Sequence, residues 1–198
     1  RLRRGEAEDT WSTHAGGTIL APFDEAEPPE VDVAAWREAC TEAVDVAQLY
    51  ERLERAGLAY GPAFRTIRSL WVGGRRNVAR LERPAGVEAD GPGSTGDGAA
   101  GRGELLSPVL LDGAFQSLFA IVAPGRGRLK PYVPYSVERI TFYRTPGASC
   151  WVSAVMHGHD EQEIRADLLL ADDAGRLLVE VKGLVCRALD GAAETGTV

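Results

Sequence analysis

The sequence is poor in residues that commonly hold metals or form disulfides. Its 198 residues include three cysteines, Cys40, Cys150 and Cys186, which lie far apart and form no CxxC pair. An odd number of distant cysteines, without histidines at zinc-site spacing, argues against a disulfide framework and against a zinc site. We therefore expect reduced, partly buried thiols and no bound metal.

Positive charge and long apolar runs are also scarce. The chain has 22 basic against 29 acidic residues, a formal net charge of -7 at pH 7, whereas nucleic-acid binding needs a basic face. No apolar run approaches the roughly 20 residues that span a bilayer, and the opening RLRRGEAEDTW lacks the apolar core of a signal peptide. We expect a soluble, cytoplasmic protein that binds neither nucleic acid nor membrane. Because the chain starts with Arg1 rather than methionine, we also expect a processed product or a piece of a longer protein.

The apolar content, 44% of the residues, is that of a globular protein and predicts one compact domain with loose ends. Residues 11–20, WSTHAGGTIL, have the character of one short strand, and the Pro/Glu-rich stretch after them has no periodicity. A lone strand has nothing to pair with. We predict that residues 1–21 end a preceding sheet, that 22–43 are a linker, that 44–190 form the domain, and that 191–198 are a tail.

The first half of the predicted domain contains a helix and a hairpin. Val46, Leu49, Tyr50 and Leu53 recur at helical spacing, and Gly57 stands where such a helix would end. In the sequence YGPAF, Gly61 and Pro62 predict a turn. Two predicted strands follow, RTIRSLWV and NVARLE, and the glycines at 73 and 74 predict a tight turn between them. The Gly-rich residues 84–104 have little to bury and predict a mobile loop.

The second half contains four strand candidates in succession, SVERITFYR, SCWVSAVM, EIRADLLLA and RLLVEVKGLVCR, separated by the turn sequences TPGA, HGHDEQ and DDAG. Consecutive strands joined by short turns pair most simply as an antiparallel meander. No alternation of strands with helices suggests a parallel sheet. The predicted class is α+β with an antiparallel sheet.

Between the two halves lies a predicted helix over residues 107–122 that is apolar on nearly every side. Ser107 and Pro108 suit its start, because a serine oxygen can cap free amides and proline at the first position loses no hydrogen bond. Asp112 and Gln116 stand four residues apart and form its one polar stripe. A glycine inside a helix, such as Gly113, lowers helix stability by about 1 kcal/mol relative to alanine. Its presence therefore predicts that a strand or a ligand approaches the helix closely at this position.

Asp112 has two interpretations. It can be a buried acid that only hydrogen-bonds a backbone amide or a tyrosine, or an acid whose pKa is adjusted for proton transfer. Burial raises the pKa of an aspartate, whereas a helix N-terminus lowers it. Half-protonation near pH 7 requires a pKa about three units above the usual ~3.9, a difference of about 4 kcal/mol. An apolar tunnel would supply that desolvation and would suit an acyl substrate.

Four motifs in order, YGPAF, SPVLLDGAFQ, PYVPYSVERITFY and DDAGRLLVEVKGLVCR, resemble the second half of the dehydratase domain of type I polyketide synthases. The resemblance covers about residues 11–190. It implies a double hot-dog fold, two antiparallel sheets each wrapped around a long helix, of which this chain is the C-terminal half. The resemblance also implies that Asp112, which matches the aspartate of the family's HPALLDA motif, is the catalytic acid. It further implies that a loop around Pro134 closes over the substrate. The substrate-binding residues that it implies are Tyr60, Gly61, Pro62, Phe64, Gln116, Pro134 and Tyr135.

The sequence departs from the family pattern at two places. Ser107 stands where the family has a histidine before the proline. The HxxxGxxxxP motif that carries the catalytic histidine is absent: four residues after His14 stands Thr18, and four residues after His157 stands a glutamate. His157 and His159 fall in a predicted polar turn and are expected to be solvated surface residues. The chain is therefore expected to provide the acid and not the base.

The resemblance implies part of a multifunctional enzyme of polyketide and antibiotic biosynthesis, a hydro-lyase that removes water from 3-hydroxyacyl carrier-protein thioesters. The substrate would arrive on the phosphopantetheine of an acyl carrier protein, with no other cofactor. The implied partners are the N-terminal hot-dog half, the carrier protein and a second copy of the domain. A dehydratase-like isomerase, a pyran-forming cyclase, a product-template cyclase and a thioester hydrolase remain alternatives, because a fold does not determine its reaction. A non-catalytic half domain that only dimerises or docks a carrier protein is a further alternative.

Overall fold

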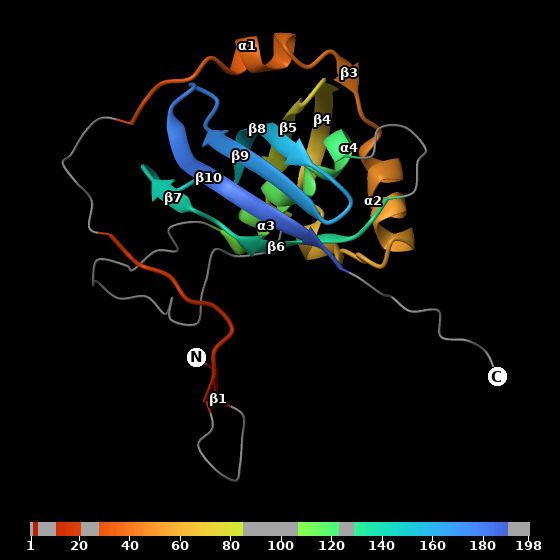
Figure 1. The fold of residues 1–198 in the computed structure, drawn as a ribbon. Helices are drawn as coiled ribbons and strands as arrows, with labels where there is room; N and C mark the ends of the chain where they lie inside the picture. The colour runs from red at the N-terminus through yellow and green to blue at the C-terminus, as the bar shows by residue number, and fades with distance from the viewer. Residues whose placement is uncertain (1, 4–10, 21–27, 85–106, 123–128, 190–198) are drawn as a thin grey trace.

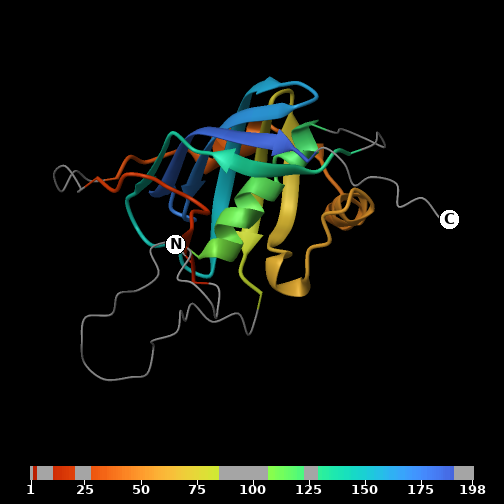
Figure 2. The same cartoon turned by 60° about the horizontal axis from the view of Figure 1, so that its bottom comes forward.

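The computed structural model describes residues 2–3, 11–20, 28–84, 107–122 and 129–189. From residue 42 onward its strands form one curved antiparallel sheet around a central helix (Figures 1 and 2). The strand order is β3-β4-β5-β8-β9-β10-β6, and β7 also pairs with β10. The strands of this sheet are β3 Glu42–Ala43, β4 Ile67–Gly73, β5 Arg76–Glu82, β6 Tyr132–Ser136, β7 Arg139–Phe142, β8 Ser149–His159, β9 Glu163–Ala171 and β10 Leu177–Ala188. The helix α3, Pro108–Gln116, packs on the inner face against β5 and β8. This confirms the expected α+β class and the sheet wrapped around a helix.

The helix α2, Val46–Arg55, forms as its spacing predicts. The carboxylate of Asp45 accepts a hydrogen bond from the backbone N–H of Gln48 at 3.1 Å and caps the helix start. Its apolar stripe of Leu49, Tyr50 and Leu53 is buried. The chain then leaves the helix through Gly57, whose φ of 91° is in the left-handed region.

The hairpin of β4 and β5 also confirms its prediction. The two strands pair from Ile67 opposite Leu81 to Gly73 opposite Arg76. Gly74 lies in the turn between them with a φ of 60°, a conformation that glycine adopts without strain.

The predicted meander of the last four strands is confirmed for the last three, because β8 pairs with β9 and β9 pairs with β10, and it is wrong for the first. β7 does not pair with β8; it pairs with β10, with Phe142 opposite Val179. β8 instead lies between β5 and β9. It also continues through His159, so the predicted turn over residues 157–162 is shorter than expected. Local periodicity indicates that a segment is a strand, but long-range packing selects its neighbours.

Pro134 lies in a strand and not in a closing loop, so that expectation is wrong. β6 pairs with β10, with Pro134 opposite Cys186. A proline cannot donate to a ladder, and its presence is compatible with the position of β6 at the end of the strand order.

Residues 11–20 contain less strand than predicted, whereas the predicted linker 22–43 contains a helix and a strand. Of residues 11–20, only β2, Trp11–Ser12, is a strand, and it pairs with β1, Leu2–Arg3. Within the predicted linker, the helix α1, Val33–Glu38, begins at Asp32, and β3 pairs with β4. The backbone N–H of Val31 donates to the carbonyl of Gly175 at 2.8 Å. Whether residues 1–21 belong to another hot dog stays a prediction, and the predicted loop 84–104 and tail 191–198 fall almost entirely outside the described residues.

The central helix is interrupted rather than continuous to residue 122. α3 ends at Gln116, and a short second helix, α4, covers Phe119–Val122. At the break the carbonyl of Ser117 accepts a hydrogen bond from the Nδ2 of buried Asn77 in β5, at 2.7 Å. Ser107 is the N-cap residue as predicted, but its hydroxyl makes no capping bond.

Gly113 explains why a glycine stands inside α3. A Cβ at this position would clash with the Oγ1 of Thr66 and would lie 3.5 Å from the Cδ1 of Leu81. The close approach predicted from this glycine is therefore confirmed, and the neighbours are side chains of the β4–β5 hairpin region.

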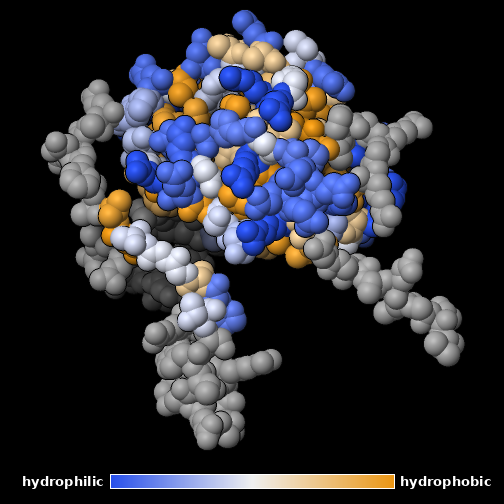
Figure 3. All heavy atoms as spheres, in the orientation of Figure 1, coloured by the Kyte–Doolittle hydropathy of each residue, from blue (hydrophilic) through white to orange (hydrophobic). Residues whose placement is uncertain are grey.

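The face of the sheet seen in Figure 3 is covered mainly by hydrophilic side chains. Ion pairs lie on β9 and β10, among them Arg165 with Glu163 at 2.9 Å and Lys182 with Asp167 at 3.3 Å. Buried apolar residues of both strands, among them Leu168 and Leu184, belong to the same core cluster as those of the central helix. Within the described ranges, no helix is long and apolar enough to cross a membrane.

Candidate active site

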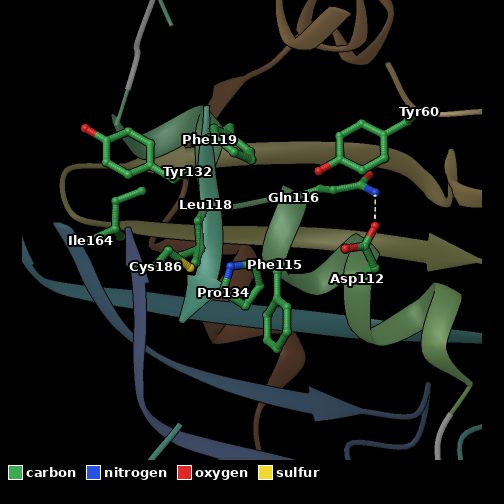
Figure 4. A pocket seen from close by; sticks show the side chains of 10 residues that line it. All are labelled: Tyr60, Asp112, Phe115, Gln116, Leu118, Phe119, Tyr132, Pro134, Ile164 and Cys186. Carbon is green, nitrogen blue, oxygen red and sulfur yellow. Dashed lines mark hydrogen bonds between the residues drawn. The ribbon is translucent and has the colours of Figure 1, made fainter. Parts of the chain in front are cut away.

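Asp112 lies on α3, about one turn after the helix begins, and lines one end of a pocket (Figure 4). Its side chain is partly buried. The Oδ2 atom accepts a hydrogen bond of 2.6 Å from the Nε2 of Gln116, four residues on. The predicted polar stripe of the helix is thus a hydrogen-bonded pair.

The side-chain amide of Gln116 is held in one orientation by its partners. Its Nε2 donates to the carbonyl of Phe64 at 3.0 Å as well as to Asp112, and its Oε1 accepts from the hydroxyl of Tyr50 at 2.9 Å. The Tyr50 oxygen in turn accepts from the backbone N–H of Ile67 at 3.3 Å. Because a carbonyl can only accept, the N–H groups of Gln116 must face Phe64 and Asp112. Gln116 therefore presents a donor to the carboxyl group.

The surroundings of Asp112 shift its protonation in opposite directions. Burial raises the pKa of the Asp112 carboxyl, and the hydrogen bond from Gln116 opposes this because it favours the charged form; burial is the larger effect. Burial also raises the pKa of Tyr60, with the charge of Asp112 adding to the shift, and raises the pKa of Tyr50 to about 12. Both tyrosine hydroxyls are therefore neutral donors near pH 7.

The pocket is polar at one end and apolar at the other. Figure 4 shows Asp112, Gln116 and Tyr60 at one end and Tyr132 and Ile164 at the other. The ten lining residues are Tyr60, Asp112, Phe115, Gln116, Leu118, Phe119, Tyr132, Pro134, Ile164 and Cys186.

Half of the predicted site residues meet at this pocket. Tyr60, Asp112, Gln116 and Pro134 line it.

The other four predicted residues do not line the pocket. Gly61 and Pro62 begin the short 3-10 helix η1, Pro62–Phe64, and they do not line the pocket. Phe64 is 41% exposed and contributes only its carbonyl, which orients Gln116. Tyr135 is 61% exposed, with the Arg187 guanidinium 3.6 Å from its ring centre. A role of these residues in substrate binding stays a prediction.

The structure adds pocket residues that the sequence reasoning missed. Tyr132 stands two residues before Pro134 in β6, and residues two apart on a strand share a face, so this one could have been found. Cys186 lies opposite both Pro134 in β6 and Ile164 in β9. This pairing joins residues far apart in sequence, and no local signal indicates it. The remaining additions, Phe115, Leu118 and Phe119, come from the central helix region.

None of the three histidines lines the pocket among the described residues. His14, His157 and His159 are all exposed, which confirms the surface location predicted for the last two. The Nε2 of His157 lies 3.1 Å from the Oδ2 of Asp167 on the sheet surface. In the described part of the chain, no group of three or more His, Cys, Asp or Glu residues is placed to hold a metal ion.

Comparison with known proteins identifies the family. A family model described as polyketide synthase dehydratase N-terminal domain matches residues 28–196. The chain belongs to the polyketide synthase dehydratase family. The family resemblance found in the sequence motifs is thereby confirmed. The description of the matching model names an N-terminal domain, whereas the motifs resemble a C-terminal half, so the assignment of this dehydratase chain to one half stays a prediction.

Curated relatives and solved structures agree with this identification. The dehydratase chain is 31% identical over 188 residues to polyketide synthase GfsE of Streptomyces halstedii, covering 92% of the chain and 4% of the relative. It is 32% identical over 189 residues to the pikromycin synthase component PikAII of Streptomyces venezuelae, covering 95% and 4%.

Among solved structures, the dehydratase domain of the CurF module of curacin polyketide synthase has 25% identity and a TM-score of 0.68, with 86% of this chain and 56% of that chain covered. A trans-AT polyketide synthase dehydratase domain from Brevibacillus brevis has 27% identity and a TM-score of 0.72, covering 83% and 55%. The dehydratase chain thus spans just over half of these solved domains and a small part of each synthase.

The arrangement in this dehydratase chain suits proton donation. A carboxyl group with a raised pKa stands at the polar end of a pocket whose other end is apolar. The N–H of Gln116 is already in place to stabilise the carboxylate that remains after the proton leaves. Among the described lining residues, none is a histidine that could serve as the opposing base.

Proposed function

We propose that this chain forms part of a dehydratase domain that removes water from 3-hydroxyacyl thioesters of an acyl carrier protein, giving enoyl thioesters. In this proposal the chain supplies Asp112 as the general acid, together with one wall of the substrate pocket. The observation that carries it is the Asp112 carboxyl at the polar end of the pocket, where burial raises its pKa and Gln116 donates to it.

The reaction needs an acid and a base at the same pH. A base takes the proton from C2 of the substrate, and the electron pair of that C–H bond forms the C2–C3 double bond. The C3–O bond breaks as Asp112 transfers its proton to the departing hydroxyl, so that water leaves. The Asp112 carboxylate that remains accepts the Gln116 N–H, and the proton held by the base restores the acid for the next cycle.

We propose that the base is a histidine from a first hot-dog half, on a preceding segment or another chain. Two observations support this: the chain covers 56% of a solved dehydratase domain, and its own histidines lie on the surface. The other proposed partners are an acyl carrier protein, whose phosphopantetheine carries the substrate, and a second copy of the completed domain in a cytoplasmic synthase.

The proposal is tested with the completed domain and a 3-hydroxybutanoyl thioester of a carrier protein, with loss of water followed by mass spectrometry. Asp112→Asn is expected to lower the rate by ~10²–10⁴, the usual contribution of a general acid or base. Asp45→Asn is the matched control, because asparagine also caps helices well and Asp45 does not line the pocket. An Asp112→Asn rate within a few-fold of wild type would show that Asp112 is not the acid, and a product of unchanged mass would indicate isomerisation instead of dehydration.

A further inference from the structure

The apolar end of the pocket is closed by Tyr132, the first residue of β6. The residue is 6% exposed, and its ring lines the pocket with Phe119 and Ile164. In Figure 4 its ring stands at the end opposite Asp112, with the hydroxyl pointing away from the other labelled side chains. A substrate whose hydroxyl lies at Asp112 therefore meets Tyr132 only with the far part of its alkyl chain.

Contacts on three sides hold the Tyr132 ring in place. The hydroxyl donates to the backbone carbonyl of Asp160 at 3.0 Å and lies 3.4 Å from the Nε2 of His159. The ring centre lies 6.1 Å from that of His159 in an edge-to-face arrangement and 6.5 Å from that of Phe119. A side chain fixed at both its ring and its hydroxyl acts as a rigid wall, because moving it breaks a hydrogen bond and two ring contacts.

Among the residues that the structure describes, the wall is one side chain thick. Tyr132 faces the pocket with its ring, whereas the partners of its hydroxyl, His159 and Asp160, are exposed at the turn between β8 and β9. A smaller residue at position 132 would therefore extend the pocket toward the surface at this turn.

We propose that Tyr132 sets the longest acyl chain that the pocket accepts, by closing its apolar end against the β8–β9 turn. This inference rests on the proposed function and adds the substrate class: 3-hydroxyacyl thioesters with a short alkyl part beyond the hydroxyl-bearing carbon. Wild type is expected to prefer 3-hydroxybutanoyl over 3-hydroxyoctanoyl thioesters, because the longer chain has no space beyond Tyr132.

The test compares kcat/KM of the completed domain for 3-hydroxybutanoyl and 3-hydroxyoctanoyl thioesters of N-acetylcysteamine. Tyr132→Ala is expected to raise the octanoyl-to-butanoyl ratio at least about tenfold, the lower limit of discrimination that an apolar pocket exerts on a methylene. Tyr132→Phe keeps the ring and loses only the hydroxyl contacts with Asp160 and His159, so its ratio is expected to change far less. Tyr143→Ala removes a partly buried tyrosine outside the pocket and is expected to leave the ratio unchanged.

An unchanged ratio in Tyr132→Ala would overturn the inference, as would a wild-type domain that uses both thioesters equally well. If the alanine variant does not fold, the octanoyl-to-butanoyl ratio is measured in Tyr132→Leu, which keeps apolar bulk but is smaller than tyrosine. An unchanged ratio in that variant would likewise overturn the inference. Binding of the saturated butanoyl and octanoyl thioesters, measured by calorimetry, tests the same length limit without turnover. Absence of dehydration with every thioester would therefore refute the proposed function, whereas equal binding of both chain lengths to wild type would refute the role of Tyr132.

Discussion

Replacing Asp112 by asparagine should change how the stability of the chain depends on pH. Burial raises the pKa of this carboxyl in the folded chain above its value of ~3.9 in the unfolded chain. Between these two pKa values the folded state keeps a proton that the unfolded state has lost, so the free energy of unfolding falls as pH rises through that window. Asparagine carries no such proton and removes this decline.

The size of the effect follows from the same linkage. Each unit by which the folded pKa exceeds the unfolded pKa lowers the stability of wild type at neutral pH by about 1.4 kcal/mol relative to acidic pH. The amide side chain in the Asp112→Asn variant would still offer an oxygen to the Gln116 N–H, so the hydrogen bond itself is kept. Relative to wild type, the free energy of unfolding of Asp112→Asn should therefore be higher at pH 7 than at pH 3.

Urea unfolding at both pH values, followed by tryptophan fluorescence, measures this difference. Trp71 and Trp151 stack on the sheet with ring centres 6.4 Å apart and report its unfolding. Asp173→Asn is the control of opposite sign: a hydrogen bond from Arg80 lowers the pKa of Asp173, so its contribution is present above the unfolded pKa and is lost as pH falls. This variant should lose more stability at pH 7 than at pH 3.

A stability difference for Asp112→Asn that is the same at pH 7 and pH 3 would refute the reasoning. It would show that the carboxyl has the same pKa in the folded and unfolded chains, and that burial does not favour its protonated form. A difference of the same sign as that of Asp173→Asn would show that the Gln116 hydrogen bond outweighs burial.

Two further substitutions test the packing and hydrogen bonding around the acid. Gly113→Ala should lower the free energy of unfolding by about 1–2 kcal/mol in urea, because the overpacking cost of ~1–3 kcal/mol exceeds the gain in helix propensity. Adding Thr66→Ala should restore part of this loss, because it removes the side chain that the new Cβ meets. Gly61→Ala is the control and should cost little, because a Cβ at that position would meet open space. Gln116→Leu removes the hydrogen-bond donor that opposes the effect of burial on Asp112, so the pKa of Asp112 should rise further. Carbon-13 NMR of the Asp112 carboxyl group measures this pKa. An unchanged or lower pKa would contradict the assigned hydrogen bond between Gln116 and Asp112.

The local elements were predictable because their signals lie within a few residues. Apolar spacing places α2, and Gly57 ends it with a left-handed conformation that few other residues adopt. The paired glycines place the β4–β5 turn in the same way. Gly113 even predicted a close neighbour, since a glycine inside a helix is costly unless something approaches it.

The sequence by itself also indicated the family and the polar pair of Asp112 and Gln116, because residues four apart on a helix always share a face. Only the tertiary structure decided what surrounds that pair. Tyr50 orients Gln116 from 66 residues away, and Asn77 meets the helix break at Ser117 from 40 residues away. The same holds for the pairing of β7 with β10, and for the meeting of Cys186 with Ile164 and Pro134. Such contacts depend on which strands lie side by side, and that choice is made by packing of the whole sheet on its helix, which no local window of sequence contains.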